Sequence, residues 1–275
     1  MDKISLTDKM KIIEKKMDFK LEINKPFVIR LDGKNFSKMV KRWKCSKPFD
    51  NVFHNVMIKV CEKLFDEISI AKVIWTGSDE ISILCLNLNN EDLWYSNRIN
   101  KILSLCGAIA STTFNLSMLK ECDDKMKEDK YNIEKNPAYF DAKIFQFDNL
   151  VDACANIIYR QNDGVTNSIS MYADIFYNYK ELHKKNSLEK IELMKNKNFN
   201  WNSDEIPIWT KYGTFLTKIN IINKIKSNDD KINDTYIRSK VVTIEQKVVK
   251  PIEIIKMINS DKLEIYQKYT NDESF

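Results

Sequence analysis

The chain has few glycines, prolines and histidines. Its 275 residues include five glycines, five prolines and only two histidines, His54 and His183. So few histidines argue against a zinc site or a histidine-based nucleophilic triad. None of the six cysteines forms a C-x-x-C pair, which predicts buried, reduced thiols in an intracellular protein. Each remaining glycine is expected at a backbone position that other residues cannot take.

Charge and hydropathy are not extreme either. The chain has 44 Lys and Arg against 39 Asp and Glu, and its net charge of +5 permits an anionic partner such as RNA or a nucleotide without requiring one. No uninterrupted apolar run approaches the roughly 18 residues of a membrane span. The N-terminal residues 1–20 lack a signal-peptide core and predict an amphipathic helix. We therefore expect no membrane partner and a cytoplasmic location, with a mitochondrial one left open.

The hydrophobic pattern of the first half predicts strands and helices in an informative order. Strands are expected over 26–32, 70–76, 81–88 and 139–147, and helices over 49–67 and 94–119. The order strand, helix, strand, strand, helix, strand is typical of the ferredoxin-like fold, in which an antiparallel sheet of order 4-1-3-2 packs against helices. The fold class is therefore α+β, with the resulting domain over 1–150.

The second half, residues 151–275, is expected to form a mostly helical extension that packs on the first domain and makes contacts to RNA and to other subunits. The pattern predicts helices over 149–182, bent near Gly164, and over 187–197. Residues 201–209 read as an aromatic loop. Strands are expected over 213–219 and 235–248, with a mobile polar loop at 223–234 between them.

Two acidic sites lie at strand ends that this topology brings to one edge of the sheet. Asp32 ends the first strand, Asp79 lies in the Gly-Ser-Asp-Glu turn between the second and third, and Asp141 begins the fourth. Turn chemistry alone is one explanation. The other is a cation between the carboxylates, because like charges at one edge repel. Oxygen ligands favour Mg²⁺, and two such ions clamp the attacking and leaving oxygens in nucleotidyl transfer.

Residues next to these carboxylates are candidates for the same site. Gly33 has no side chain and would let a backbone carbonyl or a phosphate approach closely. Glu80 should point to the sheet face opposite Asp79. Its role as an outer partner of the site or as a structural ion pair is left open.

Basic and polar residues form a second group of candidates. Lys47, Arg98, Lys101 and Lys143 could surround a triphosphate if the fold brings them to the carboxylates, although each alone fits an exposed surface charge. The segment 159–170 gathers polar side chains that either cap helices or contact RNA. These are Arg160, Gln161, Asp163 and Asn167.

Taken together, these stretches resemble the tRNA-His guanylyltransferase family and, within it, the Thg1-like 3′-to-5′ RNA polymerases. The matching segments, from residue 27 to about 218, are VIRLDGKNF, KPFD, TGSDEISIL, RINK, FDAKIF, RQNDGVTNSIS, ELHKKNSLE, FNWNSDEIPIW and KYGT. The resemblance implies a polymerase palm, two Mg²⁺ ions, ATP or GTP as the activating substrate, a tRNA or tRNA-like partner and a homotetramer.

The resemblance also implies roles for individual residues. Asp32, the Gly33 carbonyl and Asp79 match the metal ligands. The candidate catalytic residues are Asp32, Asp79 and Glu80, with the role of Glu80 left open. The turn that wraps the triphosphate matches Lys34, Asn35, Phe36 and Ser37. The phosphate contacts match Lys47, Arg98, Lys101 and Lys143, and the nucleotide pocket matches Asp50 and Ser78. Ser37 and Lys143 replace a histidine and an arginine of the eukaryotic guanylyltransferases.

The leading hypothesis is template-dependent 3′-to-5′ nucleotide addition that repairs 5′-truncated tRNAs. Where the eukaryotic guanylyltransferases have H-I-N-N, this chain has Val165-Thr166-Asn167-Ser168, similar to the repair enzymes. The alternatives are addition of a guanosine at position −1 of tRNA-His, another palm enzyme such as a nucleotide cyclase, and a palm kept only as an RNA-binding module.

Overall fold

The computed structural model describes residues 4–86, 93–121, 133–226 and 232–258. Its centre is a six-stranded antiparallel sheet with the order β4-β1-β3-β2-β5-β6. The expected ferredoxin-like order 4-1-3-2 is confirmed, and two strands from the second half extend it at the β2 edge. The bounds are β1 Phe27–Gly33, β2 Ala71–Gly77, β3 Glu80–Cys85, β4 Phe140–Gln146, β5 Thr214–Lys226 and β6 Ile232–Ile244.

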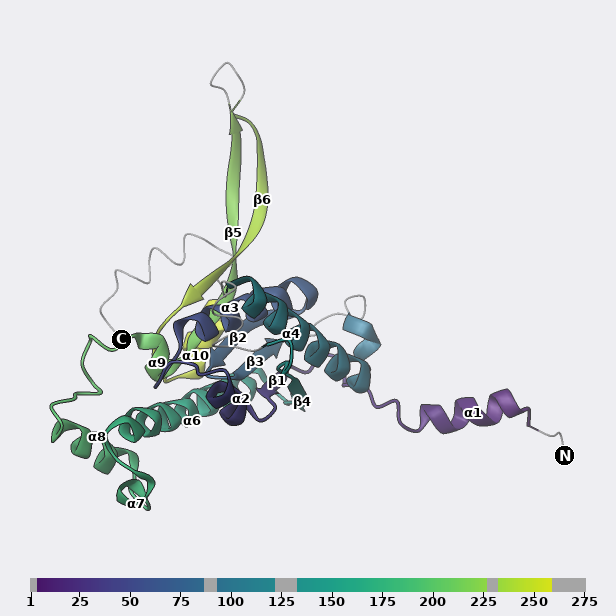
Figure 1. Ribbon diagram of the computed structural model, residues 1–275. Coiled ribbons are helices and arrows are strands. Elements are labelled where there is room, and N and C mark those ends of the chain that lie inside the picture. Colours follow the sequence, from purple (N-terminus) through teal and green to yellow (C-terminus); the bar gives the residue numbers. More distant parts are fainter. Residues whose placement is uncertain (1–3, 87–92, 122–132, 227–231, 259–275) are drawn as a thin grey trace.

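Helices cover both faces of this sheet (Figure 1). One face packs against α2 Phe36–Arg42, α3 Asn51–Glu67 and α4 Ile99–Glu121, around buried residues such as Ile29 and Phe114. The other face packs against α6 Leu150–Phe176 and α10 Pro251–Ile258, around residues such as Val28 and Trp75. The second half, after residue 150, therefore shares a sheet and a core with the first half.

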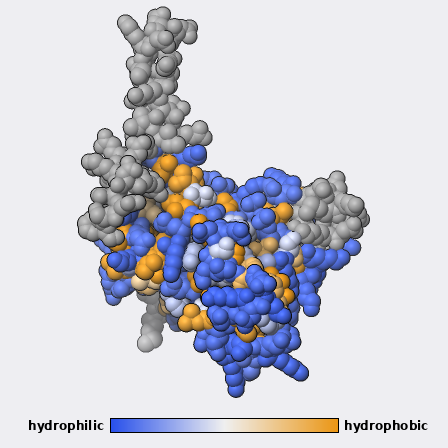
Figure 2. Space-filling view, turned by 90° about the vertical axis from the view of Figure 1, so that its left-hand side faces the viewer, coloured by the Kyte–Doolittle hydropathy of each residue, from blue (hydrophilic) through white to orange (hydrophobic). Residues whose placement is uncertain are grey.

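A third apolar cluster lies around the C-terminal half of α6. It contains Tyr172, Trp201 and Ile206, which are buried. The short helices here are α7 Tyr179–Leu182, α8 Ser187–Lys195 and α9 Ile208–Tyr212. Asn178 and Asn186 begin α7 and α8 with capping boxes, in which each asparagine side chain accepts from the helix backbone. Seen from this side, the surface is mostly hydrophilic, with small separate apolar patches (Figure 2).

The helix α4 begins later than predicted and has an unusual composition. Tyr95 and Ser96 adopt left-handed backbone angles, so residues 94–97 form a separate 3-10 turn, η2, and the α-helix starts at Ile99. The helix is long and apolar enough, by composition alone, to cross a membrane. A stripe at helical spacing, from Ile102 through Ala110 to Met118, is fully buried in the core. This stripe packs α4 into the core on its side of the sheet.

The predicted bend at Gly164 is wrong. The helix α6 runs without interruption from Leu150 to Phe176. A Cβ atom at Gly164 would lie 3.4 Å from two ring atoms of Trp75. Gly164 therefore lets α6 lie close against the Trp75 indole on β2, and the polar residues around it lie inside the helix and do not cap helix ends.

The predicted loop at 223–234 is also largely wrong. The strands β5 and β6 pair from Phe215 with Ile244 to Lys226 with Ile232, with an irregularity near Ile225. β2 pairs with β5 only from Thr214 to Thr217, so the rest of the hairpin extends beyond the sheet (Figure 1). Residues 227–231 lie outside the described part of the chain. The helix α10 was not predicted, because its eight residues are too few for a clear period.

The predicted N-terminal helix is confirmed as α1, Leu6–Lys15. Ser5 begins it by accepting a hydrogen bond from the backbone N–H of Asp8 at 3.1 Å. None of its residues is buried, and in Figure 1 it projects away from the sheet.

Candidate functional site

Four carboxylates meet at the edge of the sheet where β1 ends. In the antiparallel register, Asp32 faces Glu80 on β3 and Asp141 on β4. The two residues Ser78 and Asp79 form the turn between β2 and β3, directly before Glu80. Ser78 has a φ of 54°, a left-handed conformation that costs a non-glycine residue about 1 kcal/mol or more. The topology thus brings the two acidic sites of the sequence together.

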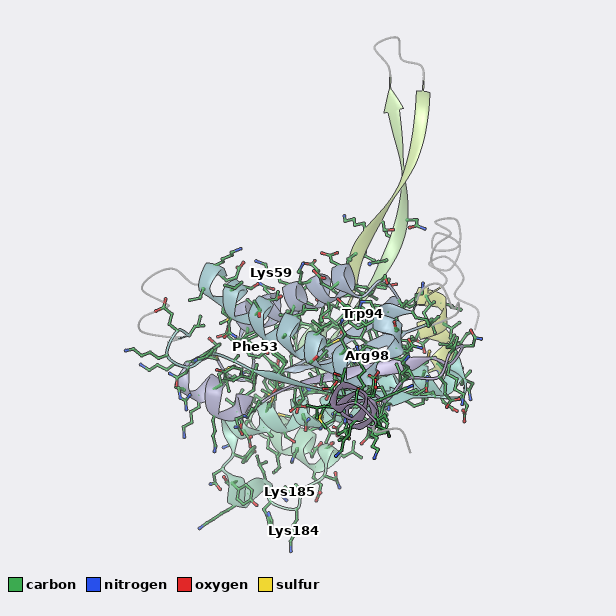
Figure 3. The ribbon with its side chains drawn as sticks, turned by 90° about the vertical axis from the view of Figure 1, so that its right-hand side faces the viewer. Phe53, Lys59, Trp94, Arg98, Lys184 and Lys185 are labelled. Carbon is green, nitrogen blue, oxygen red and sulfur yellow. The ribbon has the colours of Figure 1, made fainter. Side chains whose placement is uncertain are left out.

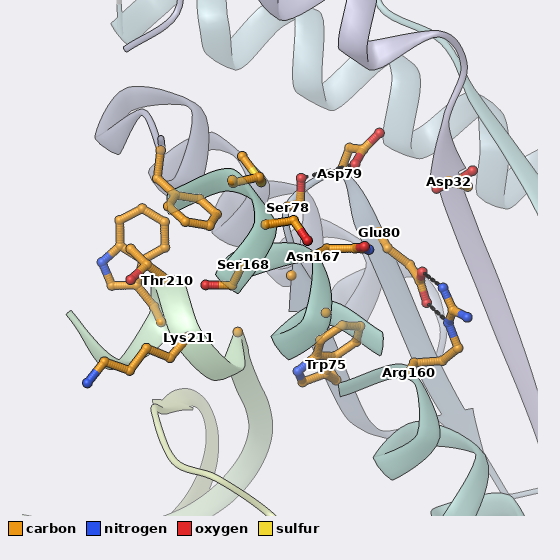
Figure 4. A pocket seen from close by; sticks show the side chains of 17 residues that line it. Asp32, Trp75, Ser78, Asp79, Glu80, Arg160, Asn167, Ser168, Thr210 and Lys211 are labelled. Atoms are coloured by element: carbon orange, nitrogen blue, oxygen red, sulfur yellow. Dashed lines mark hydrogen bonds and ion pairs between the residues drawn. The ribbon is translucent and has the colours of Figure 1, made fainter. Parts of the chain in front are cut away.

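Glu80 is neutralised by an arginine from the helix that crosses this edge. Arg160 on α6 donates from Nε to Glu80 Oε1 at 2.7 Å, and a second guanidinium nitrogen reaches the other carboxylate oxygen, a bidentate arrangement (Figure 4). Glu80 in turn raises the pKa of Arg160. Arg160 also lies 3.1 Å from Asp163. The ion pair between Glu80 and Arg160 therefore ties α6 to the sheet.

Asp32 and Asp79 have no such partner among the ion pairs of the described residues. Burial and, after it, the charge of Asp32 together raise the pKa of Asp79 to about 6. The pKa of Asp32 is raised by burial and then by Glu80 and Asp141, while Lys143 and Arg30 act in the opposite direction. Two carboxylates with raised pKa values and no paired base form a site that a cation would stabilise.

The donor set at this edge fits Mg²⁺. Within the described residues there is no cluster of three or more acidic, histidine or cysteine side chains placed to hold a metal. Mg²⁺ does not need one, because it is commonly held by one or two carboxylates together with substrate phosphates and waters. Asp32 and Asp79 supply two such carboxylates, and Gly33, which follows Asp32, adds a backbone carbonyl as a candidate third ligand.

Packing gives a further reason for a glycine at position 33, beside the predicted close approach of a ligand. A Cβ atom there would come within 2.3 Å of the Phe36 ring. That ring is buried against Phe53, Phe114 and Phe140. Gly33 is therefore required by the packing of Phe36, and the Phe36 side chain belongs to the core, leaving only its backbone to contact a ligand.

A pocket of about 810 Å³ opens on one side of the Ser78–Asp79 turn, and we call it the α2 pocket. It includes most of the residues assigned above to nucleotide binding. These are Asn35, Phe36, Ser37, Lys47, Asp50 and Ser78, and two of the predicted metal ligands, Gly33 and Asp79, lie beside them. Lys41, Lys44, Phe49, His54 and Trp209 also line it. Their side chains combine a basic rim with an aromatic wall, the composition expected around a nucleoside triphosphate.

Asp50 holds the loop at the mouth of this pocket. Its Oδ1 accepts from the backbone N–H groups of Val52 and Phe53, at 3.0 and 3.1 Å, and its Oδ2 accepts from Ser46 at 2.8 Å. It is thus the N-cap of α3.

A second pocket, of about 370 Å³, lies on the other side of the same turn, and we call it the α6 pocket. Figure 4 shows its side chains, with Asp32, Asp79 and Glu80 at one end and Thr210 and Lys211 at the other. Lys211 is buried and donates to the Ser203 carbonyl at 2.7 Å. The two pockets share Phe49, Ser78, Asp79, Met171 and Trp209. Asp79 therefore faces two cavities.

The remaining basic candidates do not all reach this edge within one chain. Lys143 lies on β4 beside Asp32, whose pKa it lowers. Arg98 forms an ion pair with Asp18 at 2.7 Å, and its backbone forms an isolated β-bridge with Lys20. These contacts place it near the start of β1, on the side from which α1 projects (Figure 3). The length of β1, about 16 Å at the usual rise per residue, separates that end from Asp32.

Lys101 lies one helical turn from Arg98, over the ring of Tyr95. Within one chain, Arg98 and Lys101 therefore lie away from the carboxylates, and their contact with a phosphate stays a prediction. Lys34 lines a separate hollow, described below.

The polar cluster of α6 divides in two. Asn167 is exposed in the α6 pocket. Gln161, which was assigned to RNA contact, is fully buried: its amide donates to the carbonyls of Tyr212 and Gln246 and accepts from the N–H of Val248. Gln161 is therefore a structural residue that joins α6 to the chain after β6, and it has no surface to offer RNA.

The sequence analysis missed His54 and Trp209. Their rings are stacked in the α2 pocket, with centroids 3.9 Å apart. Burial lowers the pKa of His54 to about 4, so its imidazole is neutral at physiological pH. No motif marked His54, because it lies on an ordinary helical face. Trp209 belongs to the aromatic loop, whose relation to α3 no local pattern could give.

Comparison with known proteins gives a consistent result. The family model described as tRNAHis guanylyltransferase matches residues 7–148, more than half of the chain. An uncharacterized protein, R259, of Acanthamoeba polyphaga mimivirus is 29% identical over 227 residues, which cover 77% of this chain and 76% of that protein.

Solved structures agree. A bacterial Thg1-like protein in complex with ATP is 32% identical, with a TM-score of 0.68 over 78% of this chain and 88% of its own. One in complex with GTP is 27% identical, with a TM-score of 0.65 over 96% and 98%. The tRNA(His) guanylyltransferase of Saccharomyces cerevisiae, at 21% identity and a TM-score of 0.63 over 73% and 88%, shares the fold. The chain therefore belongs to the tRNAHis guanylyltransferase family.

Proposed function

We propose that this protein is a 3′-to-5′ polymerase that adds nucleotides to the 5′ end of RNA under the direction of a template. Family membership supports nucleotidyl transfer. The observation that carries the proposal further is that the Ser78–Asp79 turn lies between two pockets, which both include Asp79. A transfer between two substrates needs two adjoining sites at one metal centre, whereas a nucleotide cyclase acts on one NTP.

In this proposal the α2 pocket holds the activating ATP or GTP. Lys47, Lys44 and Lys41 surround its mouth and supply positive charge for the phosphates. Asp32, Asp79 and the Gly33 carbonyl would hold Mg²⁺, which when bound neutralises phosphate charge and activates the attacking oxygen. The stacked pair of His54 and Trp209 offers a flat, uncharged wall to a base.

The chemistry then has two transfers, and each forms one P–O bond and breaks one: the first exchanges one phosphoanhydride for another, and the second forms a phosphoester as a phosphoanhydride breaks. In the first, an oxygen of the RNA 5′-monophosphate attacks the α-phosphate of the NTP and pyrophosphate leaves. In the second, the 3′-hydroxyl of an incoming NTP attacks the activated 5′-phosphate and the nucleoside monophosphate leaves. An RNA with a 5′-triphosphate enters at the second transfer. The side chains mainly position the reacting groups.

Template direction is supported by what α6 places beside Asp79. Asn167 and Ser168 line the α6 pocket where the guanylyltransferases have the end of their H-I-N-N run. No histidine lines this pocket. Pairing with the opposite strand supplies base discrimination without a protein reader. Guanosine addition to tRNA-His is the alternative, and the homotetramer and the cytoplasmic location also stay proposals.

The two neighbouring acids Asp79 and Glu80 should respond oppositely to loss of charge. Because the pKa of Asp79 is raised, its contribution to stability is present below about pH 4 and is lost as the pH rises through about 6. At pH 7.5 with a chelator, Asp79→Asn should raise the melting temperature and reduce the further rise that Mg²⁺ gives. Glu80→Gln should lower the melting temperature, with a loss of about 3 kcal/mol of unfolding free energy, because Arg160 loses its bidentate carboxylate partner. Thermal unfolding measures both, and destabilisation by Asp79→Asn without metal would contradict the assignment.

The phosphate assignments can be separated by position. Lys47→Ala should raise the KM for the NTP by roughly 10- to 100-fold, since one charge-assisted hydrogen bond contributes about 1.5–3 kcal/mol. Arg98→Ala, at the opposite edge, is the comparison in steady-state assays of pyrophosphate release. An equal rise in both variants would show that Arg98 contacts nucleotide in the assembled enzyme. No change with Lys47→Ala would remove the α2 pocket from the proposal.

Template direction is tested with 5′-truncated tRNAs in which the base opposite the missing position is varied. Each labelled NTP should be added according to the opposite base, with all four nucleotides accepted. An enzyme that adds guanosine whatever base lies opposite, or that accepts only tRNA-His, is a guanylyltransferase. An enzyme that cyclises its NTP and ignores RNA belongs to the other class of palm enzymes.

A further inference from the structure

The segment around α2 is the most basic part of the chain. Between Asp32 and Asp50 there is no acidic residue, and segment 34–47 carries six cations. Its charge of +6 exceeds the net charge of +5 of the whole chain. All six side chains are exposed, and none takes part in an ion pair of the described residues. They are Lys34, Lys38, Lys41, Arg42, Lys44 and Lys47.

These cations divide between two hollows. Lys41, Lys44 and Lys47 line the α2 pocket. Lys34, Lys38 and Arg42 instead line a separate hollow of about 260 Å³, which residues 136–139 close on the other side and which we call the Tyr139 groove. Lys38 and Arg42 are one turn apart on α2, about 6 Å along the helix axis. That spacing is similar to the distance between neighbouring phosphates of an RNA strand.

The walls of this groove are fixed by hydrogen bonds. The N–H of Lys34 donates to the Tyr139 carbonyl at 2.8 Å, and Arg42 donates to the Asn136 side chain at 2.7 Å. Asn115 on α4 both accepts from the N–H of Ala138 and donates to its carbonyl, each at 2.8 Å. The Tyr139 ring is not held in the core, because 57% of the residue is exposed. A rigid cationic groove thus presents a free aromatic ring.

The groove adjoins the carboxylate edge. Gly33 pairs with Phe140, and Asp32 pairs with Asp141. Tyr139 precedes Asp141 by two residues, which along a strand is a separation of about 7 Å. A strand of RNA in the groove would therefore pass directly beside the metal site.

We propose that the Tyr139 groove binds single-stranded RNA, with phosphates on Lys38 and Arg42 and a base stacked on Tyr139. Cations along a groove together with an exposed aromatic ring are the features that single-strand sites share. This inference rests on the proposed function and names the strand: a truncated 5′ end leaves the nucleotides of the opposite 3′ strand unpaired beside the reaction site. The groove would hold that template strand.

The experiment measures binding of two RNA hairpins with the same stem, one blunt and one with a short 3′ overhang, by fluorescence anisotropy without NTP or divalent ions. The wild-type protein should bind the overhang hairpin more tightly. The double variant Lys38→Ala with Arg42→Ala should remove that advantage. It should also make the negative slope of log K against log salt shallower by about 1.4, roughly 0.7 for each single-strand phosphate. Tyr139→Ala should weaken overhang binding about tenfold, while Tyr139→Phe keeps it.

The matched control is Lys247→Ala with Lys250→Ala, which removes two exposed cations on another part of the surface and should change neither hairpin. Thermal unfolding confirms that each variant is folded. Equal losses for the blunt and overhang hairpins would overturn the single-strand assignment, and unchanged binding would overturn the groove as an RNA site. This binding assay contains no NTP and is therefore independent of nucleotide addition. If the protein binds the overhang here but adds no nucleotide in the separate polymerase assay, only the proposed function is contradicted.

Discussion

Repulsion among carboxylates at the end of β1 is the constraint on which the site depends. Asp32 lies between Glu80 and Asp141 in the sheet, and Asp79 follows in the adjoining turn. The protein compensates one of these charges, Glu80, with Arg160, and this pair brings α6 over the edge. Asp32 and Asp79 stay uncompensated, with raised pKa values. Such a pair gains from a cation, which a phosphate-bearing substrate brings with it.

The position of α6 follows from the same edge and divides the space around Asp79. On one side, α2 and the N-terminus of α3 enclose the α2 pocket; on the other, α6 and the segment before β5 enclose the α6 pocket. Gly164 allows the close approach by which α6 meets Trp75. Two cavities at one acidic turn are the arrangement that a transfer between two phosphate-bearing substrates needs, and the cations of α2 extend it toward a strand of RNA.

The sequence was sufficient for the sheet because period-2 alternation and element order determine a ferredoxin-like register, and that register brings Asp32, Asp141 and the Asp79 turn together. It failed where the decisive contact is distant in the chain. Gly164 looked like a bend because its reason, the ring of Trp75, lies on another strand. Gln161 looked exposed because its partners, such as Val248, come much later. Polar residues at 223–234 resembled a loop, although those on either side of 227–231 pair with each other in the β5–β6 ribbon, a backbone contact that side-chain polarity does not reveal.

The most direct test of the central claim is the number of Mn²⁺ ions bound at pH 7.5 with a non-hydrolysable NTP analogue, counted by electron paramagnetic resonance. Asp32 and Asp79 each supply a ligand in this account, so the wild-type protein should bind two ions above those held by the free analogue. Asp32→Asn and Asp79→Asn should each lose at least one, while Asp141→Asn keeps both. Unchanged binding in both Asp32→Asn and Asp79→Asn would contradict the claim that these two carboxylates form the metal site.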